Sequence, residues 1–257
     1  MTILDRFKLD GKKIYVTGAG RGIGKACAFA LCEAGADVAF VARGYEEVKA
    51  AADEAAKLTG RNTIAVSADI SKPDDVKNMF QAILEAFGTL DGAFNNAGIC
   101  NADMPAEDIP YEALREIIDI NVVGTYLCCQ EAAKIMIPKK SGSILNMASM
   151  SAHIVNVPQK TSHYAVTKAG VVTMSKNLAA EWAPYNVRVN SLSPGYTLTE
   201  LALQFSEEQI NTWKKLIPMD RLEAPDELAG TVVYALSDAS TYTTGCDIIV
   251  DGGYSLW

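Results

Sequence analysis

The amino-acid sequence predicts a single-domain α/β fold, a doubly wound parallel β-sheet with helices on both faces. Apolar runs with strand character alternate with amphipathic helical stretches along the whole chain. No linker, internal repeat or low-complexity segment interrupts the 257 residues, and 49% of them are apolar, enough for one large core. Because parallel neighbours are joined by right-handed crossovers, this alternation places helices on both faces of one sheet. We therefore expect residues 1–257 to form one domain.

Seven apolar runs have the length and composition of buried strands. The first, KIYVT, is rich in β-formers and leads into glycines, and the second, DVAFVAR, is almost continuously apolar. The later runs repeat this pattern, and each is followed by a turn or a helical stretch. The seven predicted strands are residues 13–17, 37–43, 62–69, 90–98, 142–149, 187–194 and 246–251.

Six helical stretches connect these strands. The third opens with a proline and two acidic residues, as expected at a helix N-terminus. The fourth is the longest, and we expect one unbroken helix there. The six predicted helices are residues 25–36, 45–58, 73–87, 111–137, about 161–182 and about 226–236. Residues 195–218 break the alternation; such a long excursion in a compact domain is typically a lid or binding element, so we predict a lid-like insertion.

Composition narrows the functional classes. The formal net charge is −8 and no Lys/Arg block is present, which argues against a nucleic-acid partner. No run approaches the ~18 apolar residues of a membrane helix, and the N-terminus has no apolar signal core, so we expect no membrane partner and a cytoplasmic location. The six cysteines form no CxxC pair and there are two histidines, so we expect small core cysteines in a reducing compartment and no metal.

A glycine-rich turn follows the first predicted strand. In TGAGRGIG (17–24), the glycines are Gly18, Gly20, Gly22 and Gly24, which fit TGxxxGxG rather than GxGxxG. Glycines allow a tight turn and close approach of a pyrophosphate, and the N–H groups at the start of the next helix face its charge. The strand–turn–helix context therefore predicts nucleotide binding.

A tyrosine and a lysine lie one helical turn apart in SHYAVTKAG (162–170). Tyr164 and Lys168 are at i and i+4, hence on one helical face. A free tyrosine has a pKa near ~10, and a nearby ammonium or an oxidised nicotinamide favours phenolate and lowers it. The spacing fits a proton-transfer group, but it also fits a surface pair without a role.

Several motifs in order resemble the short-chain dehydrogenase/reductase family from about residue 8 to the end. They are TGAGRGIG (17–24), Asp69, NNAG (95–98), Asn121, Ser149, Tyr164-x-x-x-Lys168 and PGYTLT (194–199). Each alone is weak, and the set is specific. The resemblance implies a Rossmann-type fold and an enzyme acting on CH–OH groups, in which hydride transfer interconverts a ketone and a secondary alcohol.

The resemblance also implies catalytic roles. Tyr164 transfers the proton, Lys168 assists it and holds the nicotinamide ribose, and Ser149 orients the substrate oxygen. Asn121 anchors a water that links Lys168 to solvent; the alternative is a helix-bending polar residue bonded to backbone. Ser151 is the alternative serine, because it precedes Tyr164 by the spacing of thirteen found in many family members.

The second strand indicates which cofactor is used. An acidic residue at its end would bond the ribose 2′-OH, and an arginine would instead accommodate a 2′-phosphate. The acidic position holds Ala42, Arg43 follows it, and Arg21 lies in the glycine turn. Guanidinium groups suit phosphate, so we expect NADP(H) rather than NAD(H), unless both arginines are merely solvated.

Further cofactor contacts are implied by the resemblance alone. Asp69 and Ile70 would flank the adenine, with a strand-end cap as the alternative for Asp69, and Asn95 would brace the turn beside it. Thr197 would meet the carboxamide and Thr199 a phosphate. The remaining expected contacts are Ile23, Ala97, Gly98, Pro194 and Gly195.

The substrate is indicated by a polar loop between Ser149 and Tyr164. Several hydrogen-bonding side chains suit a substrate with many hydroxyls, and the surrounding segments are similar to the sugar-alcohol and ketose branch of the family. The candidate substrate residues are Ser151, His153, Asn156, Gln159, His163, Tyr196 and Trp257. We expect a keto-sugar or polyol substrate.

The sequence also leaves alternative functions open. An acyl carrier-protein 3-oxo group or a hydroxysteroid would require a more apolar wall. An NADP(H)-binding sensor or partner module would not need the complete Asn–Ser–Tyr–Lys set. In the resembling family, the helices predicted at 111–137 and 161–182 pack across a two-fold axis, which implies a homodimer or homotetramer.

Overall fold

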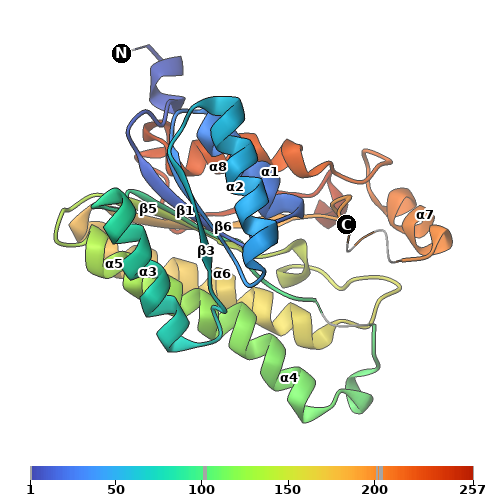
Figure 1. The fold of residues 1–257 in the computed structure, drawn as a ribbon. Helices are drawn as coiled ribbons and strands as arrows, with labels where there is room; N and C mark the ends of the chain where they lie inside the picture. Colours follow the sequence, from blue (N-terminus) through green and yellow to red (C-terminus); the bar gives the residue numbers. More distant parts are fainter. Residues whose placement is uncertain (1, 101–102, 201, 203–204, 257) are drawn as a thin grey trace.

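Seven parallel strands form one sheet with the order β3-β2-β1-β4-β5-β6-β7 (Figure 1). The computed structural model describes residues 2–100, 103–200, 202 and 205–256. The strands are β1 (Lys13–Thr17), β2 (Asp37–Ala42), β3 (Thr63–Ser67), β4 (Gly92–Asn95), β5 (Gly142–Met147), β6 (Val187–Pro194) and β7 (Asp247–Val250). The predicted doubly wound parallel sheet is confirmed, and its order reverses between β1 and β4.

Helices cover both faces of the sheet because successive strand residues point to opposite sides. Ile14 and Val16 pack under α1, α2 and α8, whereas Tyr15 packs with α3, α5 and α6 on the other face. The helices are α1 (Gly22–Glu33), α2 (Tyr45–Thr59), α3 (Pro73–Phe87), α4 (Tyr111–Ile118), α5 (Thr125–Met136), α6 (Ser162–Trp182), α7 (Glu207–Leu216) and α8 (Ala229–Leu236). Figure 1 shows the two layers on either side of the strands.

Three predictions about helical structure need correction. The helix expected over 111–137 is divided, because Asp119–Gly124 form a π-helical segment between α4 and α5. The excursion at 195–218 is not wholly irregular, because it contains α7, which begins with a capping box between Ser206 and Gln209. Helix α1 also begins earlier than predicted, directly within the glycine turn at Gly22.

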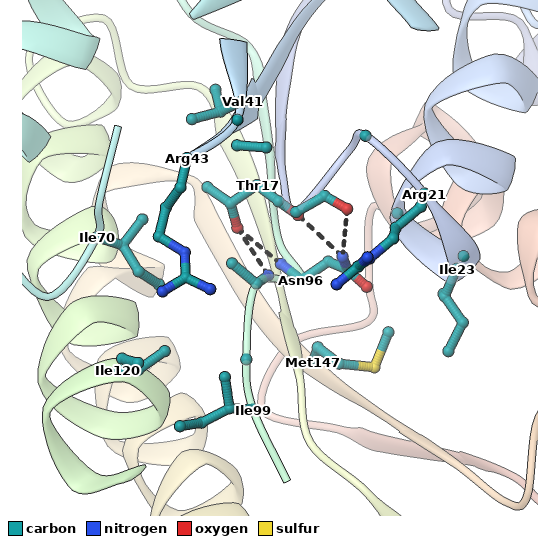
Figure 2. A pocket seen from close by; sticks show the side chains of 18 of the residues that line it. Thr17, Arg21, Ile23, Val41, Arg43, Ile70, Asn96, Ile99, Ile120 and Met147 are labelled. Carbon is teal, nitrogen blue, oxygen red and sulfur yellow. Dashed lines mark hydrogen bonds between the residues drawn. The ribbon is translucent and has the colours of Figure 1, made fainter. Parts of the chain in front are cut away.

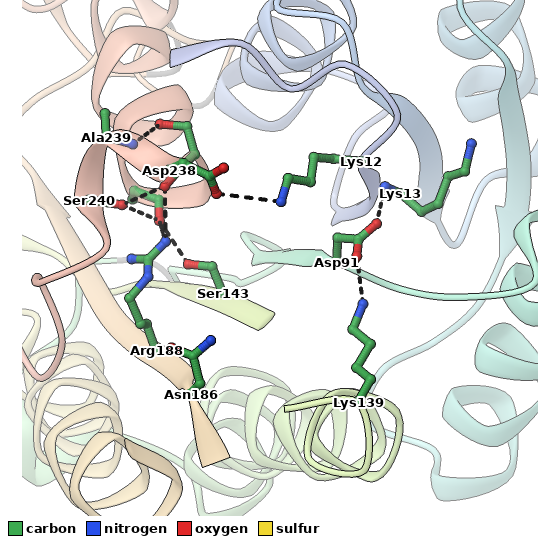
Figure 3. A network of polar contacts seen from close by, with 12 residues as sticks. Lys12, Lys13, Asp91, Lys139, Ser143, Asn186, Arg188, Asp238, Ala239 and Ser240 are labelled. Carbon is green, nitrogen blue, oxygen red and sulfur yellow. Dashed lines mark hydrogen bonds and ion pairs between the residues drawn. The ribbon is translucent and has the colours of Figure 1, made fainter. Parts of the chain in front are cut away.

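Polar contacts close the amino ends of the central strands (Figure 3). Asp91, just before β4, accepts a hydrogen bond of 2.8 Å from the backbone N–H of Lys13 at the start of β1. The same carboxylate lies 2.6 Å from Nζ of Lys139, which precedes β5. Lys12 reaches Asp238 beyond α8 at 3.5 Å. These contacts lie at the amino ends of the strands, at the opposite end of the sheet from the cleft described below.

The expectation of core cysteines is met only in part. Cys27, Cys32, Cys128 and Cys129 are buried core residues as predicted, but Cys246 is exposed. No described helix has the length and apolar character needed to cross a membrane. Within the described ranges, no three His, Cys, Asp or Glu side chains are grouped so that they could hold a metal ion.

Candidate active site

A cleft of about 540 Å³ lies at the carboxyl ends of the strands, where the sheet order reverses. Open α/β sheets bind ligands at this switch point. Most of the predicted cofactor residues line it. They are Gly18, Gly20, Arg21, Gly22, Ile23, Gly24, Arg43, Asp69, Ile70, Ala97, Gly98, Tyr164, Lys168 and Thr199. Figure 2 shows Arg43 and Arg21 reaching into the cleft from opposite sides, with Asn96 between them.

The glycine turn has room for backbone only. A Cβ on Gly24 would lie 2.1 Å from the carbonyl oxygen of Gly18, so no other residue fits at the start of α1. Gly18 has φ +67°, and a Cβ there would lie 2.8 Å from Nδ2 of Asn96. At Gly18 and Gly24 no side chain stands between the backbone at the start of α1 and the cleft, which fits a pyrophosphate.

The turn is braced by Asn96 rather than Asn95. Nδ2 of Asn96 donates to the carbonyl oxygen of Thr17 at 2.9 Å, and Oγ1 of Thr17 accepts from the N–H groups of Asn96 and Ala97, both at 3.0 Å (Figure 2). Asn95 lies in the core, where its side chain accepts from the Tyr15 hydroxyl at 2.7 Å and donates to Asn146 at 2.8 Å. The role predicted for Asn95 therefore belongs to its neighbour.

Charged groups line the part of the cleft beside β2 and β3. Arg43 is exposed there, while Arg21 lies 3.5 Å from Glu200 and so joins the glycine turn to the segment after β6. Asp69 lines the cleft and also accepts from the N–H and hydroxyl of Ser71, at 3.0 and 2.7 Å. Burial opposes its ionisation, but the hydrogen bonds from Ser71 hold the pKa of Asp69 below its usual value.

Tyr164 and Lys168 line the cleft, and Ser149 adjoins Tyr164. The Tyr164 hydroxyl is hydrogen-bonded with Ser149. Oγ of Ser149 also donates to Oγ of Ser151 at 3.1 Å and accepts from the N–H of Ser151 at 3.1 Å. Nζ of Lys168 lies 5.5 Å from the Tyr164 ring centre and donates to the carbonyl oxygen of Met147 at 2.8 Å. Ser149 and Ser151, the two alternatives for the catalytic serine, are thus hydrogen-bonded to each other.

Burial has the largest effect on the pKa values of Tyr164 and Lys168 in the protein without a cofactor. Burial and then the charge of Cys100 raise the pKa of Tyr164, while the hydrogen bond with Ser149 opposes the rise. Burial also lowers the pKa of Lys168 to about 8. Burial therefore acts against the expected effect of Lys168 on the pKa of Tyr164, and that effect stays a prediction for the enzyme with its cofactor bound.

Asn121 holds the loop after β4 from within the π-helical segment. Its Oδ1 accepts from the N–H of Ile99 at 2.8 Å, and its Nδ2 donates to the carbonyl oxygen of Ile99 at 2.8 Å and to Thr167 at 3.1 Å. A Cβ on Gly98 would lie 3.1 Å from Oδ1 of Asn121 and 3.4 Å from Nζ of Lys168. The Asn121 side chain therefore hydrogen-bonds to the backbone, as the alternative interpretation of this residue predicted. It does so next to Lys168, the predicted catalytic lysine.

A second cavity of about 210 Å³ opens from the cleft. The two share one wall, formed by Ile23, Cys100, Met147, Tyr164 and Thr199. Ser149 lines only the second cavity, as do Pro194, Gly195 and Thr197, which were predicted to contact the cofactor. Tyr164 is therefore accessible from both spaces, which suits a group that acts between a cofactor and a substrate.

Four of the predicted substrate residues line this cavity together. They are Ser151, Asn156, Gln159 and Tyr196. The Tyr196 hydroxyl accepts from Nδ2 of Asn156 and donates to Oε1 of Gln159, both at 3.1 Å. The loop before α6 and the turn after β6 thus build one polar wall.

The structure does not support the two histidines as substrate residues. His153 does not line the cavity, because its Nε2 lies 2.6 Å from Oδ2 of Asp247 in β7. His163 is buried in the first turn of α6 and does not line it either. Trp257 lies outside the described residues. Both histidines are in the polar loop region, and a sequence does not reveal which loop side chains turn away.

Sequence reasoning missed the aromatic side of the cavity. Trp213, from α7, stacks on Tyr196 with ring centres 4.3 Å apart, and Phe205 packs edge-on to Trp213 at 4.9 Å. Both line the cavity. The available signal was the aromatic content of the 195–218 excursion, which departs from a polar loop.

Known proteins resemble this chain over almost its whole length. The family model described as enoyl-(acyl carrier protein) reductase matches residues 18–255. Sorbose reductase of Candida albicans is 40% identical over 98% of this chain and 90% of its own. A probable NADP-dependent mannitol dehydrogenase of Yarrowia lipolytica is 40% identical, with the same coverage of 98% and 90%. An NADH-dependent L-xylulose reductase of Ambrosiozyma monospora is 37% identical over 98% and 97%.

A solved structure agrees with the fold. The crystal structure of a short-chain type dehydrogenase/reductase from Mycobacterium marinum superposes with a TM-score of 0.95. It is 42% identical in sequence, and the match covers 99% of both chains. The cofactors in the printed names of the relatives differ, so those names alone do not select NADP(H) or NAD(H).

Proposed function

Because the chain belongs to the short-chain dehydrogenase/reductase family, we propose that it interconverts a ketose and the corresponding polyol with NADP(H). Membership makes it an oxidoreductase acting on CH–OH groups. The observation that carries the substrate proposal is the polar wall of Asn156, Tyr196 and Gln159 in the cavity beside Tyr164. The relatives named for sorbose and mannitol support the same substrate class.

The proposed mechanism assigns proton transfer to Tyr164. A nicotinamide dinucleotide held by the glycine turn would supply or accept the hydride. During reduction the Tyr164 hydroxyl gives its proton to the carbonyl oxygen, and during oxidation it takes the proton back. Ser149, hydrogen-bonded with Tyr164 and Ser151, holds that oxygen in place. Lys168 carries positive charge below its pKa of about 8 and thereby favours phenolate.

Cofactor choice is proposed from the corner at β2. Ala42 offers no carboxylate to a ribose 2′-OH, and the exposed Arg43 can reach a 2′-phosphate. We expect Arg43→Ala to weaken NADPH binding by ~1.5–3 kcal/mol, near the lower value because the site is exposed, and to leave NADH binding almost unchanged. Fluorescence titration of both cofactors measures this.

The matched control is Lys57→Ala, which removes an exposed cation at the far end of α2, away from the cleft. It should leave both dissociation constants near the wild-type values. Equal losses for NADPH and NADH in Arg43→Ala, or a wild-type preference for NADH, would contradict the NADP(H) proposal.

Substrate class is tested by a side-by-side screen of NADPH oxidation with ketoses, β-ketoacyl esters and ketosteroids. Asn156 and Gln159 keep amide donors and acceptors beyond their bonds to Tyr196, and a polyhydroxylated chain can use them. An acyl or steroid body would cover these remaining groups without pairing them, at ~1–3 kcal/mol each. We expect the highest kcat/KM for a ketose such as a ketohexose. A higher value for every acyl or steroid compound than for any ketose would reject this substrate class.

We further propose that the 195–218 segment acts as a lid. Trp213 and Phe205 supply one side of the substrate cavity, and Glu200 pairs with Arg21 across the cofactor cleft. A lid at this place would exclude water from the reacting atoms.

A homodimer or homotetramer is proposed from exposed apolar residues on the α4–α5 and α6 surfaces, among them Tyr111, Tyr126 and Val166. Sedimentation velocity measures the assembly state.

A further inference from the structure

A carboxylate lies at the corner of the cleft where the glycine turn meets the end of β2. Glu47, in the first turn of α2, lines the cleft together with Gly20, Arg43 and Gly44. A Cβ on Gly20 would lie 3.0 Å from Cδ of Glu47 and 3.2 Å from its Oε2. The Glu47 carboxylate therefore occupies the space that a side chain at position 20 would take.

This corner is where a doubly wound fold reads the ribose 2′ position, because the residue at the end of the second strand reaches it. Ala42, at that strand end, brings no polar side chain. Arg43, directly after β2, and Glu47, in the first turn of α2, bring opposite charges to this corner. An acidic group near the 2′ position favours a hydroxyl and opposes a phosphate, as the strand-end carboxylate does in NAD-binding members of this fold class.

The charge of Glu47 is not neutralised by an ion pair. Other carboxylates of α2 pair with lysines, Asp53 with Lys49 and Glu54 with Lys25. Among the ion pairs between described residues, none includes Glu47 or Arg43. The carboxylate thus faces the cleft with its charge available to whatever binds there.

We propose that Glu47 is a specificity-determining residue that weakens the preference for a 2′-phosphate. Arg43 attracts this phosphate, and Glu47 opposes it and accepts a hydrogen bond from a 2′-OH instead. The balance of the two sets the ratio of NADPH to NADH affinity. This inference rests on the proposed dinucleotide function of the cleft and assigns a residue to its selectivity.

The experiment compares Glu47→Gln with Glu46→Gln, a variant of the neighbouring exposed glutamate that does not line the cleft. Dissociation constants of NADPH and NADH, which differ only in the 2′-phosphate, are measured by fluorescence at low ionic strength. We expect Glu47→Gln to raise the NADPH preference about 5-fold, the size expected for two charges a few ångströms apart in a water-like medium. We expect Glu46→Gln to change it less than about 2-fold, because its charge is farther from the ligand and screened.

Two results would overturn the inference. An unchanged ratio of the two constants in Glu47→Gln would mean that the carboxylate does not sense the 2′ group. An equal shift in Glu46→Gln would mean that general charge, rather than this position, is responsible. Retained NADH binding shows that the variant is folded. A wild-type preference for NADH would reject the NADP(H) proposal. The change in the ratio of the two dissociation constants between Glu47→Gln and wild type would still test the role of Glu47.

Discussion

Tyr164→Phe is expected to reduce kcat by more than ~10⁴-fold in both reaction directions. General acid–base groups typically contribute ~10²–10⁴-fold, and this hydroxyl would also hold the substrate oxygen together with Ser149, so its loss exceeds that range. Phenylalanine keeps the ring against Lys168, whose Nζ lies 5.5 Å from the ring centre. Cofactor affinity should therefore change little. Steady-state turnover and fluorescence titration of the same sample measure both.

A tyrosine elsewhere on the molecule provides the matched control. Tyr242 lies beyond α8 and is fully exposed, and it lines neither the cleft nor the second cavity. Tyr242→Phe removes the same atom and should retain wild-type turnover. If Tyr164→Phe also retained it, the proton would have to come from another group and the proposed mechanism would fail.

Lys168→Met is expected to lower the rate of alcohol oxidation at pH 7 by ~10–10³-fold. A cation a few ångströms from an acid lowers the acid's pKa by ~1–3 units, and removing it reduces the phenolate fraction correspondingly. Burial lowers the pKa of Lys168 to about 8, so the wild-type lysine carries its charge below that pH and loses it above. The deficit of the variant should therefore be largest below pH 8 and shrink as pH rises. The measurement is kcat/KM for oxidation between pH 6 and 10.

Lys168→Arg is the comparison for charge, because guanidinium keeps a positive charge over this whole range. It should remove the wild-type change near pH 8 while retaining more activity than Lys168→Met. A Lys168→Met deficit that is the same at every pH would show that the lysine acts through binding or packing, for instance through its 2.8 Å bond to Met147, and not through its charge.

The sequence predicted those features that depend on short-range pattern. The alternation of apolar runs with helical stretches predicted the sheet, because right-handed crossovers between parallel strands leave few arrangements. Gly24 was predicted as part of the turn, and its contact with the Gly18 carbonyl explains why that position admits no side chain. Tyr164 and Lys168 were predicted from helical spacing, and they do lie together.

The features that were missed depend on side-chain direction and on long-range contacts. Asn95 and Asn96 are adjacent, and only the pleat of β4 decides that the first enters the core and the second faces the turn. His153 turns to Asp247, which is distant in sequence, and no local pattern indicates that partner. The burial of Tyr164, which raises its pKa, was not foreseen because burial of the pair, unlike its spacing, cannot be read from a sequence.

The π-helical segment also keeps a long row of buried residues on one side of the α4–α5 helical stretch. Buried side chains recur in five steps from Ile117 to Met136, and these two positions are nineteen residues apart. Five turns of a regular α-helix would need about eighteen residues, so the segment absorbs one extra residue. That residue lets the row stay against the sheet while Asn121 reaches Ile99. The length of this segment is therefore constrained, because losing one residue would rotate everything after it by about 100° around the helix axis.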